Sequence, residues 1–350
     1  MFEFYKNKKV FITGHTGFKG AWMSKVLLKL GANVMGYALE PDKEFSLFSI
    51  LNLEDEMDSI FGDIRDLKGL KRALKEYNPD IVIHMAAQPL VLESYKNPVY
   101  TYETNVIGTV NILEAVRCCS NVKSVLNVTT DKVYKNNEWE WGYRENENLD
   151  GYDPYSNSKS CSELVTNSYR RSFFSDRDIS ISTARSGNVI GGGDMSADRI
   201  IPDCIRSIKE NKEMILRNPD SIRPYQHVLE AITAYLLIVE KQYNNTTVQG
   251  SYNVGPNENN CISTNKLVDM FFEFWQSKSL WNSNKYNGKH EANFLKLDCS
   301  KIKKYIGWEP IWDIEESVKK TVEWTKVLFY DKQRIIEETN NQIATYLDCM

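Results

Sequence analysis

Three glycines at a fixed spacing constrain the fold of this chain more than any other feature. Gly14, Gly17 and Gly20 follow the apolar run 10–12 and open an amphipathic stretch at 21–30. A strand that turns into a helix through glycines presents backbone N–H groups at the helix N-terminus, where they can bind a pyrophosphate. The spacing is G-x-x-G-x-x-G rather than the G-x-G-x-x-G of the standard dinucleotide fingerprint. Its place in the first strand–helix unit favours a dinucleotide site over a glycine turn without a ligand.

Apolar runs and amphipathic stretches alternate through the first half of the chain. We expect strands at 10–12, 34–39, 59–61, 81–83, 124–128 and 179–183, and helices at 21–30, 67–77, 101–118 and 153–173. This alternation predicts an α/β protein with a Rossmann-type, doubly wound parallel sheet. Right-handed crossovers then bring the carboxyl ends of the strands to one edge, where such sheets bind ligands.

The pattern changes after about residue 186 to glycine-rich and proline-rich turns with isolated helices at 201–211 and 265–278. We therefore expect a Rossmann domain over 1–185, to which a segment at about 227–254 returns. A smaller, interrupted C-terminal lobe over 186–326 is expected to cover the ligand edge. The last residues, 327–350, are interpreted as a polar terminal helix.

Composition excludes several classes of function. The net charge of −4 and the lack of a basic stripe argue against nucleic acid as a partner. No apolar run approaches the roughly 20 residues that span a bilayer, and no signal segment precedes the first strand, so we expect a cytoplasmic protein without a membrane partner. The seven cysteines show no metal-ligand spacing, so we expect reduced thiols and no metal site.

Acidic residues after the second and third expected strands are candidate cofactor ligands. Glu40 is a candidate for the ribose hydroxyls, and no arginine follows it for a 2′-phosphate, so NAD is favoured over NADP. Asp63 could accept a hydrogen bond from the adenine amino group; the alternative is a helix N-cap, a role that Asp66 fits better. His15, inside the glycine turn, is expected to orient the backbone.

Tyr155 and Lys159 form a Y-x-x-x-K pair on the helix expected at 153–173. Residues four apart on a helix lie on one face, and an ammonium beside a phenol favours the phenolate. We therefore expect the pKa of Tyr155 to be lowered toward physiological pH, which would make it the base that removes a hydroxyl proton. Such pairs also occur by coincidence on surfaces, but this one follows the glycine turn at a suitable distance.

The strand at 124–128 ends in Thr130, Asp131 and Lys132. Charged residues that end a buried strand either leave the protein there or enter a site, because an unpaired buried charge is costly. Their place at the ligand edge, one crossover before Tyr155, favours a site.

The second lobe carries further candidates. Arg217, Arg223 and His227 are candidate ligands of a diphosphate, and Asn188 precedes a glycine run close to the ligand. The alternatives are surface arginines and a tight turn. His84 and His290 have no evident partner and are interpreted as structural.

These motifs together resemble the extended short-chain dehydrogenase/reductase family that works on nucleotide sugars. The resemblance rests on FITGHTGFKGAW, HMAAQPLV, TTDKVY, EWEWGYRENE, GYDPYSNSKS, GNVIGGGD and RPYQHVLE, and runs from about residue 8 to 325. It implies NAD as the cofactor, CDP-D-glucose as the substrate and a 4,6-dehydratase reaction. The lobe over 186–326 would bind the nucleotide sugar.

The resemblance also implies roles for individual residues. Tyr155 would deprotonate the 4-hydroxyl, Thr130 would hold the 4-oxygen and Asp131 would protonate the departing 6-hydroxyl. Lys132 is either the base for C5 or a stabiliser of the enolate. The residues expected to bind the cofactor are Gly14, Thr16, Gly17, Phe18, Lys19, Gly20, Glu40, Asp63, Ile64, Ala86, Ala87, Tyr155 and Lys159. Those expected to bind the substrate are Gln88, Asn188, Arg199, Arg217, Arg223 and His227.

Helices 101–118 and 153–173 commonly pair with their symmetry mates in this family, so the resemblance implies a homodimer and leaves a tetramer open. Three other functions remain at this point. They are another nucleotide-sugar 4,6-dehydratase, a 4-epimerase, which would need no leaving-group acid such as Asp131, and a non-catalytic NAD-binding protein.

Overall fold

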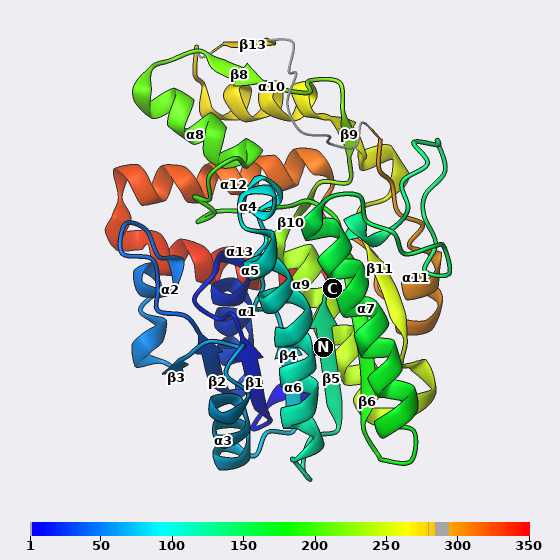
Figure 1. The fold of residues 1–350 in the computed structure, drawn as a ribbon. Coiled ribbons are helices and arrows are strands. Elements are labelled where there is room, and N and C mark those ends of the chain that lie inside the picture. The colour runs from blue at the N-terminus through cyan, green and yellow to red at the C-terminus, as the bar shows by residue number, and fades with distance from the viewer. Residues whose placement is uncertain (1, 279, 284–293) are drawn as a thin grey trace.

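A parallel sheet of seven strands forms the centre of the molecule, in the order β11-β6-β5-β4-β1-β2-β3 (Figure 1). The structure, a computed structural model, describes residues 2–278, 280–283 and 294–350. The predicted Rossmann-type, doubly wound sheet is confirmed. Its strands are β1 Lys9–Thr13, β2 Asn33–Ala38, β3 Asp58–Phe61, β4 Ile81–His84, β5 Ser124–Val128, β6 Ser180–Ser186 and β11 Ser251–Val254.

Helices cover both faces of this sheet, which explains why its central strands read as apolar runs rather than as alternating patterns. Val10 and Ile12 of β1 belong to the hydrophobic cluster on one face, and Phe11 belongs to the cluster on the other. The first cluster is formed with α1 Phe18–Lys29, α2 Leu47–Ile50 and α9 Val228–Asn244; the second is formed with α3 Leu67–Tyr77, α6 Gly108–Arg117 and α7 Pro154–Phe173.

The helix expected at 101–118 is longer and less regular than predicted. It begins with α5 Pro98–Tyr102, after the short α4 Val91–Lys96, and passes through a π-helical turn at Glu103–Ile107 before α6. Hydrophobic periodicity does not reveal a single wide turn, because the apolar positions on either side of it still fall on one face.

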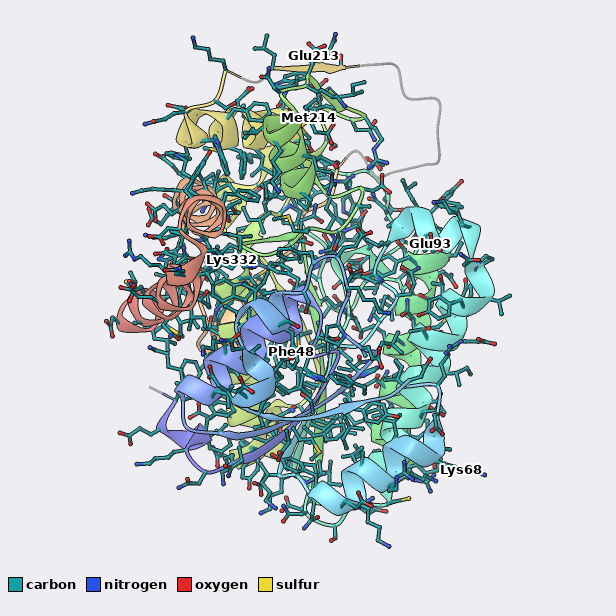
Figure 2. All side chains as sticks on the ribbon, turned by 90° about the vertical axis from the view of Figure 1, so that its left-hand side faces the viewer. Phe48, Lys68, Glu93, Glu213, Met214 and Lys332 are labelled. Atoms are coloured by element: carbon teal, nitrogen blue, oxygen red, sulfur yellow. The ribbon has the colours of Figure 1, made fainter. Side chains whose placement is uncertain are left out.

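The second lobe lies beyond the carboxyl ends of the strands, at the top of Figure 1. In the turned view of Figure 2, Met214 marks this lobe, and Phe48 marks helix α2 below it. A separate hydrophobic cluster holds the lobe together. Its elements are α8 Ile200–Glu210, α10 Thr264–Trp275, α12 Ile314–Tyr330 and three two-stranded sheets: β7 Val189–Ile190 with β10 Gln226–His227, β9 Ile222–Arg223 with β12 Ile262–Ser263, and β8 Met214–Leu216 with β13 Trp281–Ser283.

The C-terminal segment differs from the polar helix that was predicted. α12 ends at Tyr330, and a second helix, α13 Ile335–Asp348, packs against the core (Figure 1). Ile343 and Tyr346 on α13 are fully buried. The predicted terminal helix is present, but Ile335, Ile343 and Tyr346 along it are buried, so it packs on the core.

Two kinds of feature are absent from the described part of the chain, and short elements complete it. Its helices include none that is long and apolar enough to cross a membrane. Nowhere in the described ranges do three or more His, Cys, Asp or Glu side chains form a group suited to a metal ion. The remaining elements are α11 Ser300–Ile306 and the 3-10 turns Glu3–Tyr5, Leu53–Asp55, Asp131–Val133, Thr246–Val248, Glu258–Asn260 and Lys332–Arg334.

Candidate active site

The glycine turn after β1 forms a cradle that other residues would fill. Gly14 has a φ of +80°, and a Cβ added there would lie 2.8 Å from backbone atoms of Ala86. A Cβ on Gly20 would lie 2.0 Å from the carbonyl oxygen of Gly14. Gly17 precedes α1, whose first turn contains no acidic residue and receives no side-chain cap. The open helix N-terminus and the close approach of the loop after β4 fit a dinucleotide pyrophosphate.

The other cofactor candidates surround this cradle. Thr16 donates a hydrogen bond from its Oγ1 to the carbonyl oxygen of Leu39, 3.1 Å away, and so fixes the turn to the end of β2, next to the exposed Glu40. Phe18 packs against the core at the start of α1. Ala87 follows Ala86 in the loop after β4.

Asp63 and Ile64 lie after β3, beside the cradle, but their side chains already have partners. The carboxylate of Asp63 forms an ion pair with Arg65 at 2.7 Å, and Arg65 holds the pKa of that carboxyl below its usual range. Ile64 is buried against Gly108. Asp66 caps α3 by accepting a hydrogen bond from the backbone N–H of Lys68, which confirms its predicted role.

His15 does not orient the backbone of the turn, contrary to the prediction. Its ring is fully buried, lies edge-on to Phe48, and its Nε2 lies 3.1 Å from Ser59 Oγ. The ring packs where Gly36 has no side chain, and burial lowers the pKa of His15 to about 4. His15 therefore fills the space between the turn and strands β2 and β3.

His84 is structural, as interpreted, but it does have partners. Its Nδ1 lies 2.7 Å from Thr13 Oγ1 and its Nε2 lies 3.4 Å from Thr109 Oγ1. Burial lowers its pKa to about 3, so the ring is neutral at physiological pH. His290 lies outside the described residues.

The end of β5 brings three predicted catalytic residues together. Thr130 caps the 3-10 turn at Asp131–Val133 and donates a hydrogen bond to Asp131 Oδ1 at 3.0 Å. Asp131 is fully buried, and its Oδ2 has no hydrogen-bond partner among the described residues. Lys132 donates from its Nζ to Asp131 Oδ1 at 2.9 Å and to Asn188 Oδ1 at 3.1 Å. A buried carboxyl oxygen without a partner fits a site that binds a hydroxyl group.

Tyr155 and Lys159 lie next to this turn, one helical turn apart on α7. Tyr155 forms a hydrogen bond with Thr130, and Lys159 donates from its Nζ to the carbonyl oxygen of Val128 at 3.2 Å. Burial raises the pKa of Tyr155 to about 12 and lowers that of Lys159 to about 8. The predicted lowering of the tyrosine pKa is therefore not produced by the chain alone, since desolvation of the phenolate outweighs the favourable hydrogen bond.

Lys19 reaches the same site from α1. Its ammonium lies 3.5 Å from the hydroxyl of Tyr235. Burial, the cations of Arg199 and Lys159 and, more weakly, that of Lys132 lower the pKa of Lys19 to about 7. The side chain therefore extends past the glycine turn toward the catalytic residues, which its position in the glycine motif did not indicate.

Two arginines of the second lobe are well placed for an anionic ligand. Arg199 forms an ion pair with the buried Asp194 at 2.8 Å, close enough to influence Tyr155 and Lys19. Arg223 on β9 is only 8% exposed and forms no ion pair with a carboxylate in the described part of the chain. A guanidinium that is buried without a protein counter-ion fits a phosphate group. Arg217 forms a long ion pair with Asp198 at 3.9 Å.

The structure does not support two predicted substrate ligands. His227 is fully buried between Trp22 and Trp312, and its Nδ1 accepts a hydrogen bond from the backbone N–H of Leu229. Gln88 is 5% exposed and uses its amide on Thr101 and on the backbone of Leu90. Both assignments stay predictions, because a motif locates a residue along the chain but does not give the direction of its side chain.

The fold and the site define a class. A parallel Rossmann sheet with a glycine turn after β1, and a Tyr–Lys pair on the helix that follows a Thr-Asp turn, are the features of the extended short-chain dehydrogenase/reductases. A family model described as GDP-mannose 4,6 dehydratase matches residues 11–321. The chain belongs to this family of nucleotide-sugar dehydratases and is a hydro-lyase.

Known relatives agree with this assignment. The chain is 46% identical to CDP-glucose 4,6-dehydratase of Salmonella typhimurium over 99% of this chain and 98% of that protein. It is 28% identical to dTDP-glucose 4,6-dehydratase of Shigella flexneri over 90% and 92% of the two chains.

The fold matches that of dTDP-glucose 4,6-dehydratase from Bacillus anthracis in complex with NAD, with a TM-score of 0.78, 20% identity and coverage of 91% and 96% of the two chains. UDP-glucose 4-epimerase from Stenotrophomonas maltophila, with bound NAD, gives a TM-score of 0.82 at 19% identity and covers 92% and 99%.

Proposed function

We propose that this enzyme converts CDP-D-glucose to CDP-4-dehydro-6-deoxy-D-glucose with NAD as its cofactor. The observation that carries the proposal is the buried Asp131 carboxyl, with one oxygen unpaired, beside the hydrogen-bonded Thr130 and Tyr155. A leaving-group acid at this position is what a dehydratase needs in addition to the proton acceptor that all such enzymes share. The 46% identity to CDP-glucose 4,6-dehydratase supports the choice of sugar nucleotide.

The cofactor would be held by the residues of the glycine cradle. Backbone N–H groups at Gly17 and the start of α1 would bind its pyrophosphate, and Glu40 would accept a hydrogen bond from a ribose hydroxyl. NAD, when bound, accepts a hydride from C4 of the sugar and later returns it to C6. Lys159, and the positive charge that the oxidised cofactor would supply when bound, would both favour the phenolate form of Tyr155.

The chain's own groups then move the protons. Tyr155 takes the proton of the 4-hydroxyl while Thr130 holds the same oxygen by a hydrogen bond. The resulting 4-ketone makes the C5 proton acidic. Elimination breaks the C5–H bond and the C6–O bond, and the oxygen leaves as water when it receives a proton from Asp131.

The Asp131–Lys132 ion pair can supply both the acid and the base of the elimination. Transfer of one proton from the Lys132 ammonium to Asp131, across 2.9 Å, leaves a neutral amine and a neutral carboxylic acid. The amine can accept the C5 proton and the acid can protonate the leaving hydroxyl. If the proton stays on Lys132, its ammonium stabilises the enolate instead, and other groups must accept the C5 proton and protonate Asp131. Lys132→Arg keeps a cation but cannot serve as the base. The rate of C5 exchange in this variant therefore separates the two roles.

A single incubation tests the proposed reaction. The enzyme with NAD and CDP-D-glucose in D₂O should form a 4-keto-6-deoxy sugar that carries deuterium at C5, detected by NMR and mass spectrometry. Unchanged CDP-D-glucose together with turnover of a dTDP- or GDP-sugar would overturn the substrate assignment. Recovery of a C4 epimer with intact C6 oxygen would overturn the dehydratase reaction, and a Tyr155→Phe variant serves as the inactive control.

We also propose a homodimer formed by α5, α6 and α7. Large apolar side chains are exposed along these helices, namely Val99 (70%), Ile107 (49%), Leu164 (54%) and Phe173 (42%). Burying them against a second copy would pair helices from both subunits and remove the patch from water. Sedimentation should show a dimer that Leu164→Arg converts to a folded monomer; a wild-type monomer would exclude the interface. A cytoplasmic location stays a prediction.

A further inference from the structure

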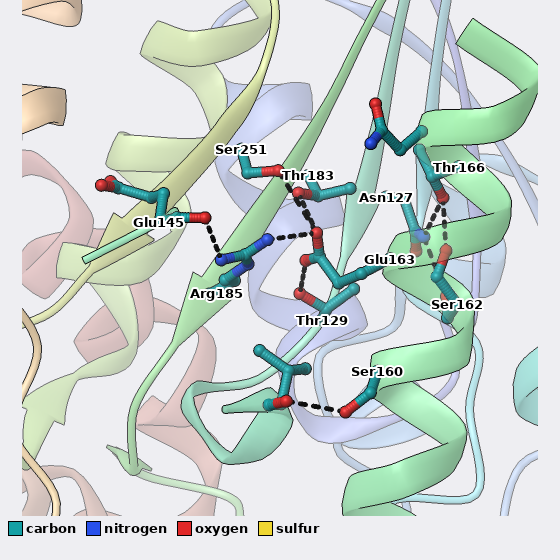
Figure 3. Close-up of polar contacts among 12 residues, drawn as sticks. Asn127, Thr129, Glu145, Ser160, Ser162, Glu163, Thr166, Thr183, Arg185 and Ser251 are labelled. Atoms are coloured by element: carbon teal, nitrogen blue, oxygen red, sulfur yellow. Dashed lines mark hydrogen bonds and ion pairs between the residues drawn. The ribbon is translucent and has the colours of Figure 1, made fainter. Parts of the chain in front are cut away.

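An acidic residue that the mechanism does not use lies one helical turn beyond Lys159. Tyr155, Lys159 and Glu163 are spaced four apart on α7 and therefore share one face of the helix. Glu163 is 2% exposed and forms an ion pair of 2.9 Å with Arg185 on β6, which is 3% exposed (Figure 3). A fully buried ion pair gives little stability compared with apolar residues, so its presence beside a catalytic pair calls for another explanation.

The carboxylate of Glu163 connects α7 to strands β6 and β11 and to the residue that follows β5. Its Oε1 accepts a hydrogen bond from Thr129 at 2.5 Å, and its Oε2 accepts from Thr183 at 2.7 Å and from Ser251 at 3.3 Å (Figure 3). Thr129 directly precedes Thr130. The carboxylate therefore fixes the helix that carries the Tyr155–Lys159 pair relative to the turn that carries Thr130 and Asp131.

Glu163 is also the anion nearest to Lys159 along α7. Two titratable groups face Lys159 from other elements: the neutral His84 of β4 and Lys19 of α1. Neither of them is an anion that could stabilise the Lys159 ammonium. Burial lowers the pKa of Lys159 to about 8, and Glu163 is the group that opposes this shift. Removal of the Glu163 charge would therefore leave Lys159 with burial unopposed.

Arg185 helps to keep Glu163 ionised. Burial alone would raise the pKa of Glu163, but the guanidinium of Arg185 and the hydrogen bonds from Thr129 and Thr183 together outweigh it, and the pKa is lowered. Arg185 is in turn held by the hydroxyl of Tyr134 at 2.9 Å and by the carbonyl oxygen of Glu145 at 3.0 Å. The other charged groups near Glu163 are Arg170 and Lys301.

We propose that Glu163 is a positioning residue of the active site: it supplies the negative charge that keeps Lys159 an ammonium and fixes α7 to the end of β5. Its part in catalysis rests on the proposed function, whereas its effect on the charge of Lys159 does not. Lys159 as an ammonium favours the phenolate of Tyr155, so loss of the Glu163 charge should impair the proton acceptor at alkaline pH.

The test measures Lys159 directly in the folded chain without substrate. Competitive acetylation with isotopically labelled acetic anhydride, followed by mass spectrometry of the peptide with Lys159, gives the pH at which the amine becomes neutral. Glu163→Gln should lower this midpoint by about one pH unit or more. Glu163→Asp keeps the negative charge, so its midpoint should stay close to that of the wild type. The matched control is Thr166→Val, which removes a 2.8 Å hydrogen bond from Asn127 to the same helix and no charge (Figure 3).

Activity gives the second readout. With CDP-D-glucose, the alkaline limb of the kcat profile should move down with the Lys159 midpoint in Glu163→Gln and stay in place in Thr166→Val. If Glu163→Gln does not fold, the double variant Glu163→Gln/Arg185→Met also removes the arginine that the first substitution leaves unpaired. This double variant should still lower the Lys159 midpoint. An unchanged midpoint in either Gln variant, or an equal shift in Thr166→Val, overturns the proposal. Lack of turnover by the wild type overturns the proposed function, and the acetylation result still decides the role of Glu163.

Discussion

Lys159 donates a hydrogen bond from its Nζ to the carbonyl oxygen of Val128, 3.2 Å away, and this bond joins the catalytic helix to the last residue of β5. The next residues along the chain are Thr129, which binds Glu163, and Thr130, which binds Tyr155. The turn and the helix thus meet through three successive residues. A buried lysine that ties two elements together keeps its donor groups oriented, but it is costly to keep charged.

Asp131→Asn should separate oxidation from elimination. The amide keeps the size of the side chain and can still accept from Thr130 and Lys132, but it cannot protonate the leaving hydroxyl. We expect kcat for dehydration to fall by about 10²–10⁴-fold while the reduced cofactor still forms. Absorbance of the reduced cofactor in a single turnover, together with NMR of the sugar, measures both steps. Full dehydration by this variant would show that Asp131 is not the acid.

Lys159→Met should stabilise the fold while it abolishes catalysis. The pKa of Lys159 is about 8 in the folded chain and 10.5 for a free lysine, so charging it in the folded state costs up to about 3 kcal/mol. The unfolded chain binds more protons between these two values, so this penalty is complete below pH 8 and disappears as the pH rises toward 10.5. The gain in unfolding free energy should therefore be largest at neutral pH and shrink above pH 8. Urea unfolding at pH 7 and pH 9.5 tests the sign; a gain that grows with pH would contradict it.

Substitution by alanine should have a large effect at one glycine of the cradle and a small effect at another. A Cβ on Gly20 would lie 2.0 Å from the carbonyl oxygen of Gly14, whereas a Cβ on Gly17 would have its nearest neighbour at 3.5 Å. Gly20→Ala should therefore distort the turn, lower the unfolding free energy by about 1–3 kcal/mol and remove NAD binding. Gly17→Ala, at the N-cap of α1, should lower the unfolding free energy by less than about 1 kcal/mol. Thermal unfolding and calorimetric titration with NAD distinguish the variants, and equal stability losses would show that the close contact at Gly20 relaxes.

The sequence predicts those parts of the site whose chemistry depends on local spacing. Each of these motifs lies within a single strand–helix unit. They are the glycine turn, the Thr130–Asp131–Lys132 turn and the Tyr155–Lys159 pair. The direction of a side chain depends on what packs around it, which is why His227 was assigned to the ligand although it lies in the core.

Pairs that join distant segments were missed for a related reason. Glu163 and Arg185 come from different elements, and Glu230 and Tyr346 are separated by 116 residues. One local signal could have pointed to Glu163. It lies four residues after Lys159, so it falls on the same helical face as Tyr155 and Lys159. The pKa of Tyr155 could not be predicted either, because it depends on burial that only the assembled site creates.

Glu230→Gln should make the stability of the chain less sensitive to pH. Glu230 on α9 accepts hydrogen bonds from the backbone N–H groups of Ile311 and Trp312, and from the hydroxyl of Tyr346 on α13. Burial raises its pKa to about 7 from an ordinary value of 4.5. The folded state therefore binds the extra proton between these values, so the wild type loses stability as the pH rises from about 4.5 to 7. The neutral amide removes this loss.

The difference in unfolding free energy between Glu230→Gln and the wild type should be close to zero near pH 4.5, grow in favour of the variant up to pH 7, and then stay constant. Chemical unfolding at intervals across this range measures it. Thr339→Val provides the control, because it removes the 2.8 Å hydrogen bond that Trp324 donates to α13 and changes no titrating group. The control should lower stability equally at every pH. A pH-independent difference for Glu230→Gln would show that the carboxyl of Glu230 does not titrate in this range, and that α13 is held to the core without regard to its charge.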